Sequence, residues 1–485
     1  MKEIKRATQS VDGDRWIPTT CSVCYASCSI LCHVVDGVLV KIEGNPKSPN
    51  SAGRLCAKGA SAIMLQYDPN RLKVPLMRTN PEKGIGIDPK WKEISWDEAL
   101  DIIAERLRKV RSEDPRKLFN QGTTTMSSSA RKVRFAFSTA FGTSNGWAAG
   151  GGLHCGNGAH LFGGLMHASW SIVPDFQYCN YALYFGASKG HSAGHVANAN
   201  AQQAADARAR GMKMVVVDPM CNFAAAKATE WVPIRIGTDA ALALAMVNLL
   251  LNEYKLYDAE YLKYKTNASY LIRGDGYYLR DRETSKPVVW DSADGKAKTW
   301  DDATVEDLAL EGNFTVDGVE CRPAFALLRE HVKKYTPEMA SQITTIPAAT
   351  IRRLAREFGE EARIGSTIVI DGEKLPYRPV AAIFFRGAQG HKNSAYNCAA
   401  IDMLNQVVGA ADVPGGCLGF NPAGLRSPEI GDRSFIGDAD FMPHPDEDGL
   451  MITGTWMGGR GPYPMHAIGR PYTVSLRDAF PLAMF

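Results

Sequence analysis

The stretch CSVCYASCSILC, residues 21–32, places four cysteines close together near the start of a chain of 485 residues. Three of them follow the spacing C-x2-C-x3-C, and the next cysteine comes 27 residues later, in GRLCAKG. A [4Fe–4S] cluster takes one thiolate for each iron, and three thiolates from one loop with a fourth from a separate turn meet that requirement. The spacing therefore predicts an iron–sulfur site whose ligands are Cys21, Cys24, Cys28 and Cys56.

Two other interpretations of these cysteines stay open. A structural zinc site usually has a close pair of ligands at each end, whereas the second part of this pattern is Cys56 alone. The thiols could also be unliganded, and Cys32 has apolar neighbours that suit a core position. The stretch HVVDGVLVKIEG (33–44) predicts a hairpin that turns at Asp36–Gly37. Such a hairpin would bring Cys56 back toward the other thiols.

The composition is that of an ordinary globular protein, with 45% hydrophobic and 22% charged residues. Because 485 residues exceed what one hydrophobic core organises, we expect two or more domains. The net charge of +3 argues against nucleic acid or an anionic membrane as a partner. The longest apolar runs are shorter than a membrane-spanning helix, and the first residues carry no export signal. We therefore expect a cytoplasmic protein without a transmembrane segment of its own.

From about residue 91 the pattern changes to alternating helices and strands. Ser95, with Glu98 at the third helical position, predicts a capped helix start. The segments 181–188 (YALYFGAS) and 213–219 (KMVVVDP) read as buried strands, and a helical pattern that ends at Gly211 lies between them. Strand, helix and strand in this order favour a parallel sheet.

The remaining segments are less regular. A second helix follows Gly237, and helical patterns return at 323–335 and 347–362 before an apolar strand at 381–387. The polar, turn-rich residues 265–320 are predicted to form an excursion on the surface. The last 65 residues show little periodicity.

Taken together, these segments resemble a known family, the molybdenum or tungsten bis-pterin oxidoreductases, also called the dimethyl sulfoxide reductase family. The cysteine spacing followed by AKG, the stretch PNRLKVPLMR (69–78) and the stretch WKEISWDEALDIIAERL (91–107) resemble successive segments of that family. The resemblance implies an α/β multidomain fold, in which a β-rich iron–sulfur domain precedes Rossmann-like parallel-sheet domains. The nearest branches are the polysulfide and thiosulfate reductases and acetylene hydratase.

The resemblance also implies a division into domains. Residues 1–75 would form the [4Fe–4S] domain, and residues 76–160 together with 360–485 would form the pterin-binding α/β domain. Residues 161–359 would form a Rossmann-like domain that binds the guanine dinucleotide. Chains of this family usually continue into a C-terminal domain that closes over the second pterin. We expect that domain to be absent from this chain or to be supplied by a separate polypeptide.

Cys155, in GGGLHCGNGAH (150–160), stands where the family presents the side chain that binds molybdenum or tungsten. A thiolate suits a soft metal, although a cysteine between glycines is by itself also compatible with a small core residue. Histidines near this position are candidates for proton transfer near neutral pH, or else ordinary hydrogen-bonding residues. A lysine after the fourth cluster cysteine would assist electron transfer between cluster and pterin. The catalytic candidates beside Cys155 are thus Lys58, His154, His160 and His167.

Further similarities lie at the positions where the family binds the guanine dinucleotide. Open α/β sheets bind ligands at the carboxyl ends of their strands, and a carboxylate can accept the N–H groups of a guanine edge. The family often has two arginines after its Asp-Pro pair, but this chain has Met220 and Cys221. The loop RGAQGHKNS (386–394) resembles a pterin-contacting loop of the family. The implied cofactor contacts are Gly186, Ser188, Asp218, Pro219, Gly237, Thr238, Asp239, Gly387, Gln389, His391 and Asn393.

The implied function is that of a molybdopterin-dependent oxidoreductase catalytic subunit with two-electron chemistry of the oxygen- or sulfur-atom transfer type. Its cofactors would be a [4Fe–4S] cluster and a Mo or W bis(molybdopterin guanine dinucleotide), and its partner an iron–sulfur electron-transfer subunit. One alternative is a non-redox hydratase or hydroxyl-transfer enzyme, although Tyr25 stands where acetylene hydratase has an aspartate. The other is a truncated, non-catalytic iron–sulfur subunit. The substrate stays open.

Overall fold

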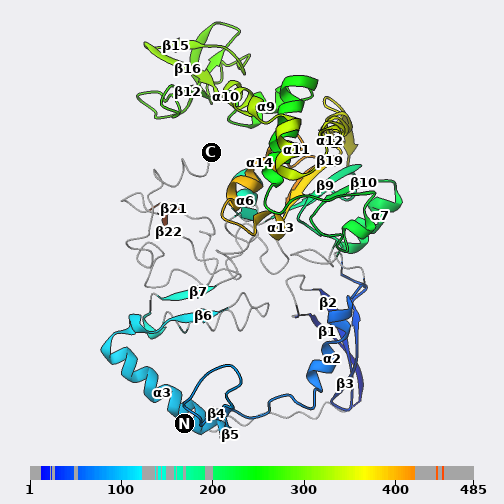
Figure 1. Cartoon of the computed structure of the whole chain (residues 1–485), viewed down its shortest axis with the longest axis vertical. Coiled ribbons are helices and arrows are strands. Elements are labelled where there is room, and N and C mark those ends of the chain that lie inside the picture. The colour runs from blue at the N-terminus through cyan, green and yellow to red at the C-terminus, as the bar shows by residue number, and fades with distance from the viewer. Residues whose placement is uncertain are drawn as a thin grey trace. The chain divides into compact units, whose positions relative to one another are not determined.

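The computed structural model describes residues 13–21, 23, 28–48, 53–122, 137, 140–143, 145–148, 158–159, 161–167, 171–191, 200–420, 444–445 and 451–452. The chain divides into two compact units (Figure 1). The first unit comprises Met1–Gly152 with Ala423–Phe485, and the second comprises Leu153–Pro422.

The first unit begins with an antiparallel sheet of three strands in the order β1 (Asp14–Thr20), β2 (Ser29–Val35) and β3 (Val38–Gly44). Between β2 and β3 the turn residues Asp36 and Gly37 have φ angles of 47° and 81°. Positive φ at both central residues is what a type I′ hairpin turn requires. The hairpin predicted from the sequence is therefore confirmed.

Short elements and one long helix complete the described part of this unit. Ser95 precedes the long helix, and its Oγ accepts the backbone N–H of Glu98 at 3.0 Å, so the predicted cap is confirmed. Strand β4 pairs with β5 and β21 with β22, both antiparallel, while β6 and β7 pair in parallel. The elements are α1 (Ala57–Ala60), α2 (Ala62–Gln66), β4 (Leu76–Arg78), β5 (Trp91–Glu93), α3 (Trp96–Glu113), η1 (Pro115–Lys117), β6 (Asn120–Gly122), β7 (Gly146–Ala148), β21 (His444–Pro445) and β22 (Met451–Ile452).

The second unit is built on a parallel sheet of four strands in the order β11–β10–β9–β19. Strands β9 and β19 are buried along their whole length. Because both faces of the sheet are covered, these strands consist of continuous apolar residues. The parallel sheet predicted from the sequence is confirmed, and β19 pairs with β9 although the two are far apart in the chain. The strands are β9 (Tyr181–Phe185), β10 (Lys213–Val217), β11 (Glu230–Val232) and β19 (Val380–Phe384).

Helices cover this sheet, and α14 packs against both α8 and β19. The helix predicted after Gly237 is confirmed, but it passes from α8 into a π-helical segment, η4, and ends at Lys255 with a φ of 58°. The helical elements are α6 (Leu161–His167), α7 (Ala201–Ala209), η3 (Ala225–Lys227), α8 (Asp239–Asn248), η4 (Leu249–Tyr254), α9 (Ala259–Lys265), α10 (Ala324–His331), η5 (Val332–Lys334), α11 (Pro337–Thr344), α12 (Ala348–Glu361), α13 (Arg386–Gln389) and α14 (Ser394–Val407).

The turn-rich segment 265–320 contains strands with a small core of their own, which the sequence did not predict. Leu271, Val288 and Cys321 form that core, and the rings of Trp290 and Phe314 stack beside it at 4.4 Å. In Figure 1 these strands project from the helices around the parallel sheet. The strands are β12 (Leu271–Arg273), β13 (Val288–Asp291), β14 (Lys296–Thr299), β15 (Phe314–Val316) and β16 (Val319–Pro323).

Two further antiparallel pairs belong to the second unit: β17 (Thr367–Ile370) with β18 (Glu373–Pro376), and β8 (Ser171–Pro174) with β20 (Cys417–Phe420). Within the described ranges, no helix combines the length and the apolar character that crossing a membrane would need.

Candidate cofactor site

Three of the predicted cluster ligands lie among the described residues, and they come from two segments of the first unit. The backbone N–H of Cys21 donates to the carbonyl of Cys28 at 2.9 Å, which closes the loop between β1 and β2. Cys56 immediately precedes α1, and a methyl group built on Gly59 of that helix would lie 3.5 Å from Sγ of Cys21. Helix α1 therefore packs against the cysteine loop.

The chemistry of these thiols fits an iron–sulfur cluster. Cys21, Cys28 and Cys56 all carry free thiols, which a cluster requires. For Cys32, burial and then the neighbouring Cys21 raise the pKa of the thiol, so it yields a thiolate less readily. Cys32 is only partly buried, so the structure does not place it in the core. Cys24 lies outside the described residues.

Lys58 lies on α1 and is exposed, one residue before the glycine that contacts Cys21. This places the lysine backbone close to the cysteine loop. Its predicted role in electron transfer remains a prediction.

Two glycines bring the carboxyl ends of β9 and β19 together. The N–H of Gly387 donates to the carbonyl of Gly186 at 2.9 Å, and Gly186 has a φ of 50°. A methyl group on Gly186 would lie 2.5 Å from the nitrogen of Ala388, and one on Gly387 would lie 2.6 Å from Cα of Gly186. Neither position has room for a side chain, so bare backbone forms this edge of the sheet. Ser188 follows in the same loop, where its carbonyl accepts the N–H of His191 at 2.9 Å.

Asp218 ends β10 and belongs to the same edge. One carboxylate oxygen accepts the N–H of Met220 at 2.9 Å, and the other accepts Nδ2 of Asn222 at 2.8 Å. Burial raises the pKa of Asp218. Each oxygen keeps a second lone pair that can accept a ligand N–H group. Pro219 is exposed beside it.

The loops after β11 and β19 meet at Gly237 and His391. A methyl group built on Gly237, whose φ is 76°, would lie 3.6 Å from the His391 ring. The hydroxyl of Thr238 donates to the carbonyl of Arg235 at 2.6 Å, which closes the turn before α8. The N–H of Asn393 donates to Nδ1 of His391 at 3.2 Å, and Asn393 itself is exposed.

Asp239 begins α8 and is buried. Its Oδ2 accepts Nδ2 of Asn397 at 3.0 Å, and burial raises the pKa of its carboxyl group. Asn397 was not among the residues predicted from the sequence. The available signal was its polar amide on a helix, SAYNCAAIDMLNQV, that is otherwise mostly small and apolar.

Gln389 is 1% exposed, and its side chain is hydrogen-bonded to the backbone of the segment that follows Cys155. Its Oε1 accepts the N–H of Ala159 at 2.5 Å, and a methyl group on Gly158 would lie 2.9 Å from Sγ of Cys398. Residues 158–159 therefore pack on α13 and α14. Cys155, His154 and His160 lie outside the described residues.

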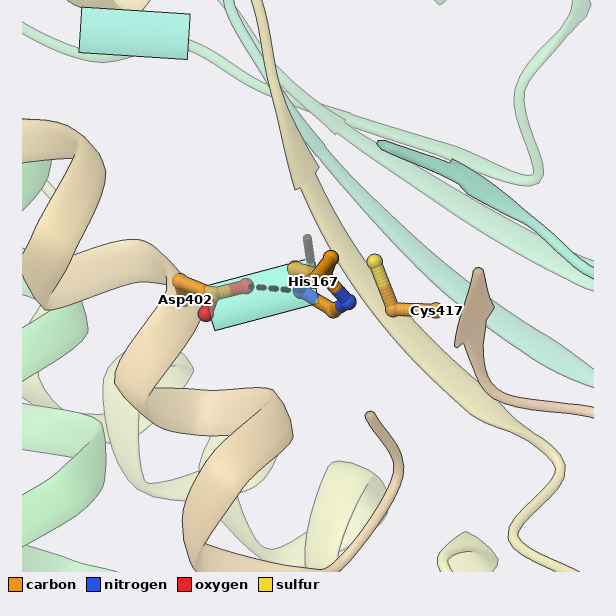
Figure 2. A group of neighbouring side chains, drawn as sticks. All are labelled: His167, Asp402 and Cys417. Atoms are coloured by element: carbon orange, nitrogen blue, oxygen red, sulfur yellow. Dashed lines mark hydrogen bonds and ion pairs between the residues drawn. The ribbon is translucent and has the colours of Figure 1, made fainter. Parts of the chain in front are cut away.

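His167 ends α6 and lies between two carboxylates. Its Nε2 is 3.1 Å from Oδ1 of Asp402, and its Nδ1 is 2.8 Å from Oδ2 of Asp412 (Figure 2 shows the first of these contacts). Burial alone would lower the pKa of His167, but the charge and hydrogen bond of Asp402, followed by those of Asp412, raise it to about 10. His167 is thus an imidazolium ion at neutral pH. Of the two roles that the sequence leaves open, this arrangement favours the hydrogen-bonding role over proton transfer.

The same histidine belongs to a group that could hold a metal ion. Ligand atoms of His167, Asp402 and Cys417 all lie within 4.8 Å of one another, and Figure 2 shows them converging from three elements. Both ring nitrogens already contact carboxylates, and Asp402 also accepts from the amides of Asn405 and Gln406. Burial raises the pKa of the Cys417 thiol well above its ordinary value, so the thiol stays neutral. His167 and Asp402 are therefore already engaged in hydrogen bonds with protein groups.

Comparisons with known proteins agree with this geometry. Residues 14–68 match the molybdopterin oxidoreductase Fe4S4 domain, and residues 71–453 match the molybdopterin oxidoreductase family. Among solved structures, acetylene hydratase from Pelobacter acetylenicus aligns with a TM-score of 0.55 at 23% identity, covering 83% of this chain and 44% of that one. At this identity the alignment shows the shared fold.

The chain is also similar in sequence to polypeptides that are named as parts of redox enzymes. The matching polypeptide of the sulfite dehydrogenase of Allochromatium vinosum is 34% identical over 426 residues, which cover 82% of this chain and 43% of the relative. The alpha polypeptide of the perchlorate reductase of Dechloromonas aromatica is 31% identical over 69% of this chain and 40% of the relative. The molybdopterin-containing polypeptide of the thiosulfate reductase of Salmonella typhimurium is 30% identical over 52% of this chain and 31% of the relative.

The chain thus spans less than half the length of these relatives, at 43%, 40% and 31%. Its two family matches follow one another along the chain and together run from residue 14 to residue 453. The chain therefore belongs to the molybdopterin oxidoreductase family and carries the Fe4S4 domain of that family.

Proposed function

We propose that the chain is the catalytic subunit, or the cofactor-bearing part of it, of an oxidoreductase of the oxygen- or sulfur-atom transfer type. The observation that carries this proposal is the convergence of the predicted contact residues on the carboxyl edge of one parallel sheet. Ligands bind open α/β sheets at that edge. The free thiols of the first unit supply the iron–sulfur part of the proposal.

The proposed cofactors are a [4Fe–4S] cluster and a Mo or W bis(molybdopterin guanine dinucleotide), which supplies two-electron redox chemistry when bound. The residues present fit the dinucleotide. Gly186 and Gly387 leave backbone bare for close approach, and Asp218 presents carboxylate oxygens that can accept guanine or ribose donors. Exposed Gly387 and Asn393 and the half-buried Gly237 and His391 offer further polar contacts.

The remaining roles are assigned as follows. Cys155 is the proposed thiolate ligand of the heavy metal, and His154 and His160 are the proposed proton-transfer groups beside it. His167 holds α6 in place, because an imidazolium with a pKa of about 10 keeps its proton near neutral pH. Lys58 is the proposed cation between cluster and pterin.

An iron–sulfur electron-transfer subunit is the proposed partner. The sulfite dehydrogenase and perchlorate reductase relatives are each named as one polypeptide of a multisubunit enzyme, which supports this proposal. The relatives named for sulfite and thiosulfate favour an inorganic sulfur compound as the substrate class.

The test is metal and nucleotide analysis of the full chain, purified without oxygen. We expect about four iron atoms per chain, together with molybdenum or tungsten and guanine nucleotide released by acid. A reduced viologen dye should then be oxidised by thiosulfate or polysulfide, or an oxidised dye reduced by sulfite.

Two results would contradict the proposal. Iron without molybdenum, tungsten or nucleotide would indicate a non-catalytic iron–sulfur subunit. Addition of water to an unsaturated substrate with no electron donor present would indicate a hydratase instead.

A further inference from the structure

Asn397 on α14 is 1% exposed, yet every polar atom of its side chain has a partner. Its Oδ1 accepts the N–H of Ala240 at 2.7 Å. Its Nδ2 lies 2.7 Å from the carbonyl of Ala388 and 3.0 Å from Oδ2 of Asp239. One amide thus joins the first turn of α8 to α13, the short helix in the connection that follows β19.

The same amide reaches a third group at this junction. Nδ2 of Asn397 is 3.2 Å from Nε2 of His391, whose ring covers Gly237. The two hydrogens of this nitrogen go to Asp239 and Ala388, and the His391 ring, whose Nδ1 accepts the N–H of Asn393, lies in contact beside them. Asn397 therefore contacts both loops that the dinucleotide proposal depends on.

Asp239 makes this position sensitive to charge. Its carboxylate is 5% exposed, and among the described residues it forms no ion pair, so the Asn397 amide is its main neutral donor. A buried carboxylate without a cation is costly unless donors surround it. A second carboxylate at position 397 would repel the first at close range.

Asn405 on the same helix provides a comparison. It is also fully buried, and its amide brackets one residue of β19, with Oδ1 accepting the N–H of Ala382 and Nδ2 donating to its carbonyl, both at 2.8 Å. Asn405 therefore holds the middle of a strand, whereas Asn397 holds two loops at the strand ends. A variant of Asn405 therefore measures the effect of losing a buried amide on stability alone, whereas a variant of Asn397 also changes the geometry of the loops.

We propose that Asn397 is a positioning residue that sets the loops after β11 and β19 against each other for binding of the pterin guanine dinucleotide. This inference rests on the proposed function. The residue itself faces protein on all sides, so it acts through Asp239, Ala388 and His391 rather than by touching the ligand.

The test compares full-length Asn397→Asp, Asn397→Ser and Asn405→Ala chains by guanine nucleotide content and melting temperature. Losing a buried hydrogen bond to a charged group corresponds to about tenfold in an equilibrium constant. We expect both Asn397 variants to retain about tenfold less nucleotide than the wild type under dilution. Asn405→Ala should lose as much melting temperature but keep its nucleotide.

A swapped pair, Asp239→Asn with Asn397→Asp, restores one carboxylate and one amide at the junction. We expect it to recover part of the nucleotide retention lost in Asn397→Asp, because it removes the repulsion between carboxylates but leaves the carbonyl of Ala388 without its amide donor. Recovery of the melting temperature without the nucleotide would overturn the inference, because the contact would then belong to Asp239 itself.

Equal nucleotide loss in Asn405→Ala, or none in either Asn397 variant, would also overturn it. These outcomes differ from failure of the proposed function, which would appear as a wild-type chain without molybdenum, tungsten or guanine nucleotide.

Discussion

His167 carries a positive charge where its side chain has no contact with solvent. Asp402 is equally inaccessible, whereas Asp412 keeps 45% of its side chain exposed, so the charge is shared between one buried and one half-exposed carboxylate. Removing one partner of a buried ion pair leaves the other uncompensated. The group therefore ties α6 to α14 and to the turn before β20.

This arrangement predicts a pH dependence. The folded pKa of about 10 lies above the ordinary value of 6.5, so the protonated ring is the stabilising form. Its contribution is complete below pH 6.5 and disappears as the pH rises through about 10. The difference in free energy of unfolding between wild type and His167→Gln should be about 3–5 kcal/mol at pH 6.5 and should shrink toward pH 10, as measured by denaturant titration.

His331→Gln is the matched control, because His331 is an exposed histidine of the same unit. Its free energy of unfolding should stay within about 0.5 kcal/mol of the wild type. A His167→Gln difference that is constant from pH 6.5 to 10 would show that the ring is not charged in the folded protein.

The position of His167 near Cys155 makes it a candidate for proton transfer or an ordinary hydrogen-bonding residue, and the sequence does not choose between the two. The partners of this histidine lie 235 and 245 residues further along the chain, and no spacing rule connects residues that far apart. The cysteine motif, by contrast, could be recognised because its first three members lie within eight residues. Local patterns were readable, and contacts made by the fold were not.

At the scale of elements, the carboxyl ends of β9 and β19 meet through two glycines. Gly387→Ala would place a methyl group 2.6 Å from Cα of Gly186, which forces the two loops apart. Overpacking of this kind costs about 1–3 kcal/mol. We expect a lower melting temperature and weaker retention of guanine nucleotide.

Gly390→Ala tests whether this effect is specific. A methyl group there meets its nearest neighbour, the carbonyl oxygen of Arg386, at 3.5 Å, an ordinary contact distance. This variant should match the wild type in both measurements. Equal losses in the Gly387 and Gly390 variants would mean that the loop tolerates no side chain anywhere, rather than that the two strand ends meet.

The elements also show where sequence patterns are informative. Buried strands such as Tyr181–Phe185 are continuous apolar runs, and they were predicted with their direction. Strands of three to five residues between 271 and 323 were read as surface turns, because such short segments give no measurable alternation. The pairing of β19 with β9 joins Val380 to Tyr181, a distance in sequence that no local pattern reports.

At the scale of the whole molecule, the residues proposed for the iron–sulfur cluster and those proposed for the dinucleotide belong to different compact units. We therefore expect Cys56→Ala to lose at least half of the chain's iron while keeping its guanine nucleotide. Iron and nucleotide contents of the same purified sample measure both.

Cys32→Ala is the control for this experiment, since Cys32 lies on β2 and its thiol pKa is raised. Its iron content should equal that of the wild type. Iron loss in Cys32→Ala but not in Cys56→Ala would show that Cys32, and not Cys56, is the fourth ligand of the cluster.

Helix α14 has a consequence for how this protein can change over evolution. Asn397, Asp402 and Asn405 each engage a different part of the second unit: the loops at the strand ends, α6, and the middle of β19. Inserting or deleting one residue would rotate everything beyond it by about 100°, so no register shift could preserve all three attachments. The spacing from Asn397 to Asn405 is therefore constrained, and we expect insertions and deletions to fall outside this stretch.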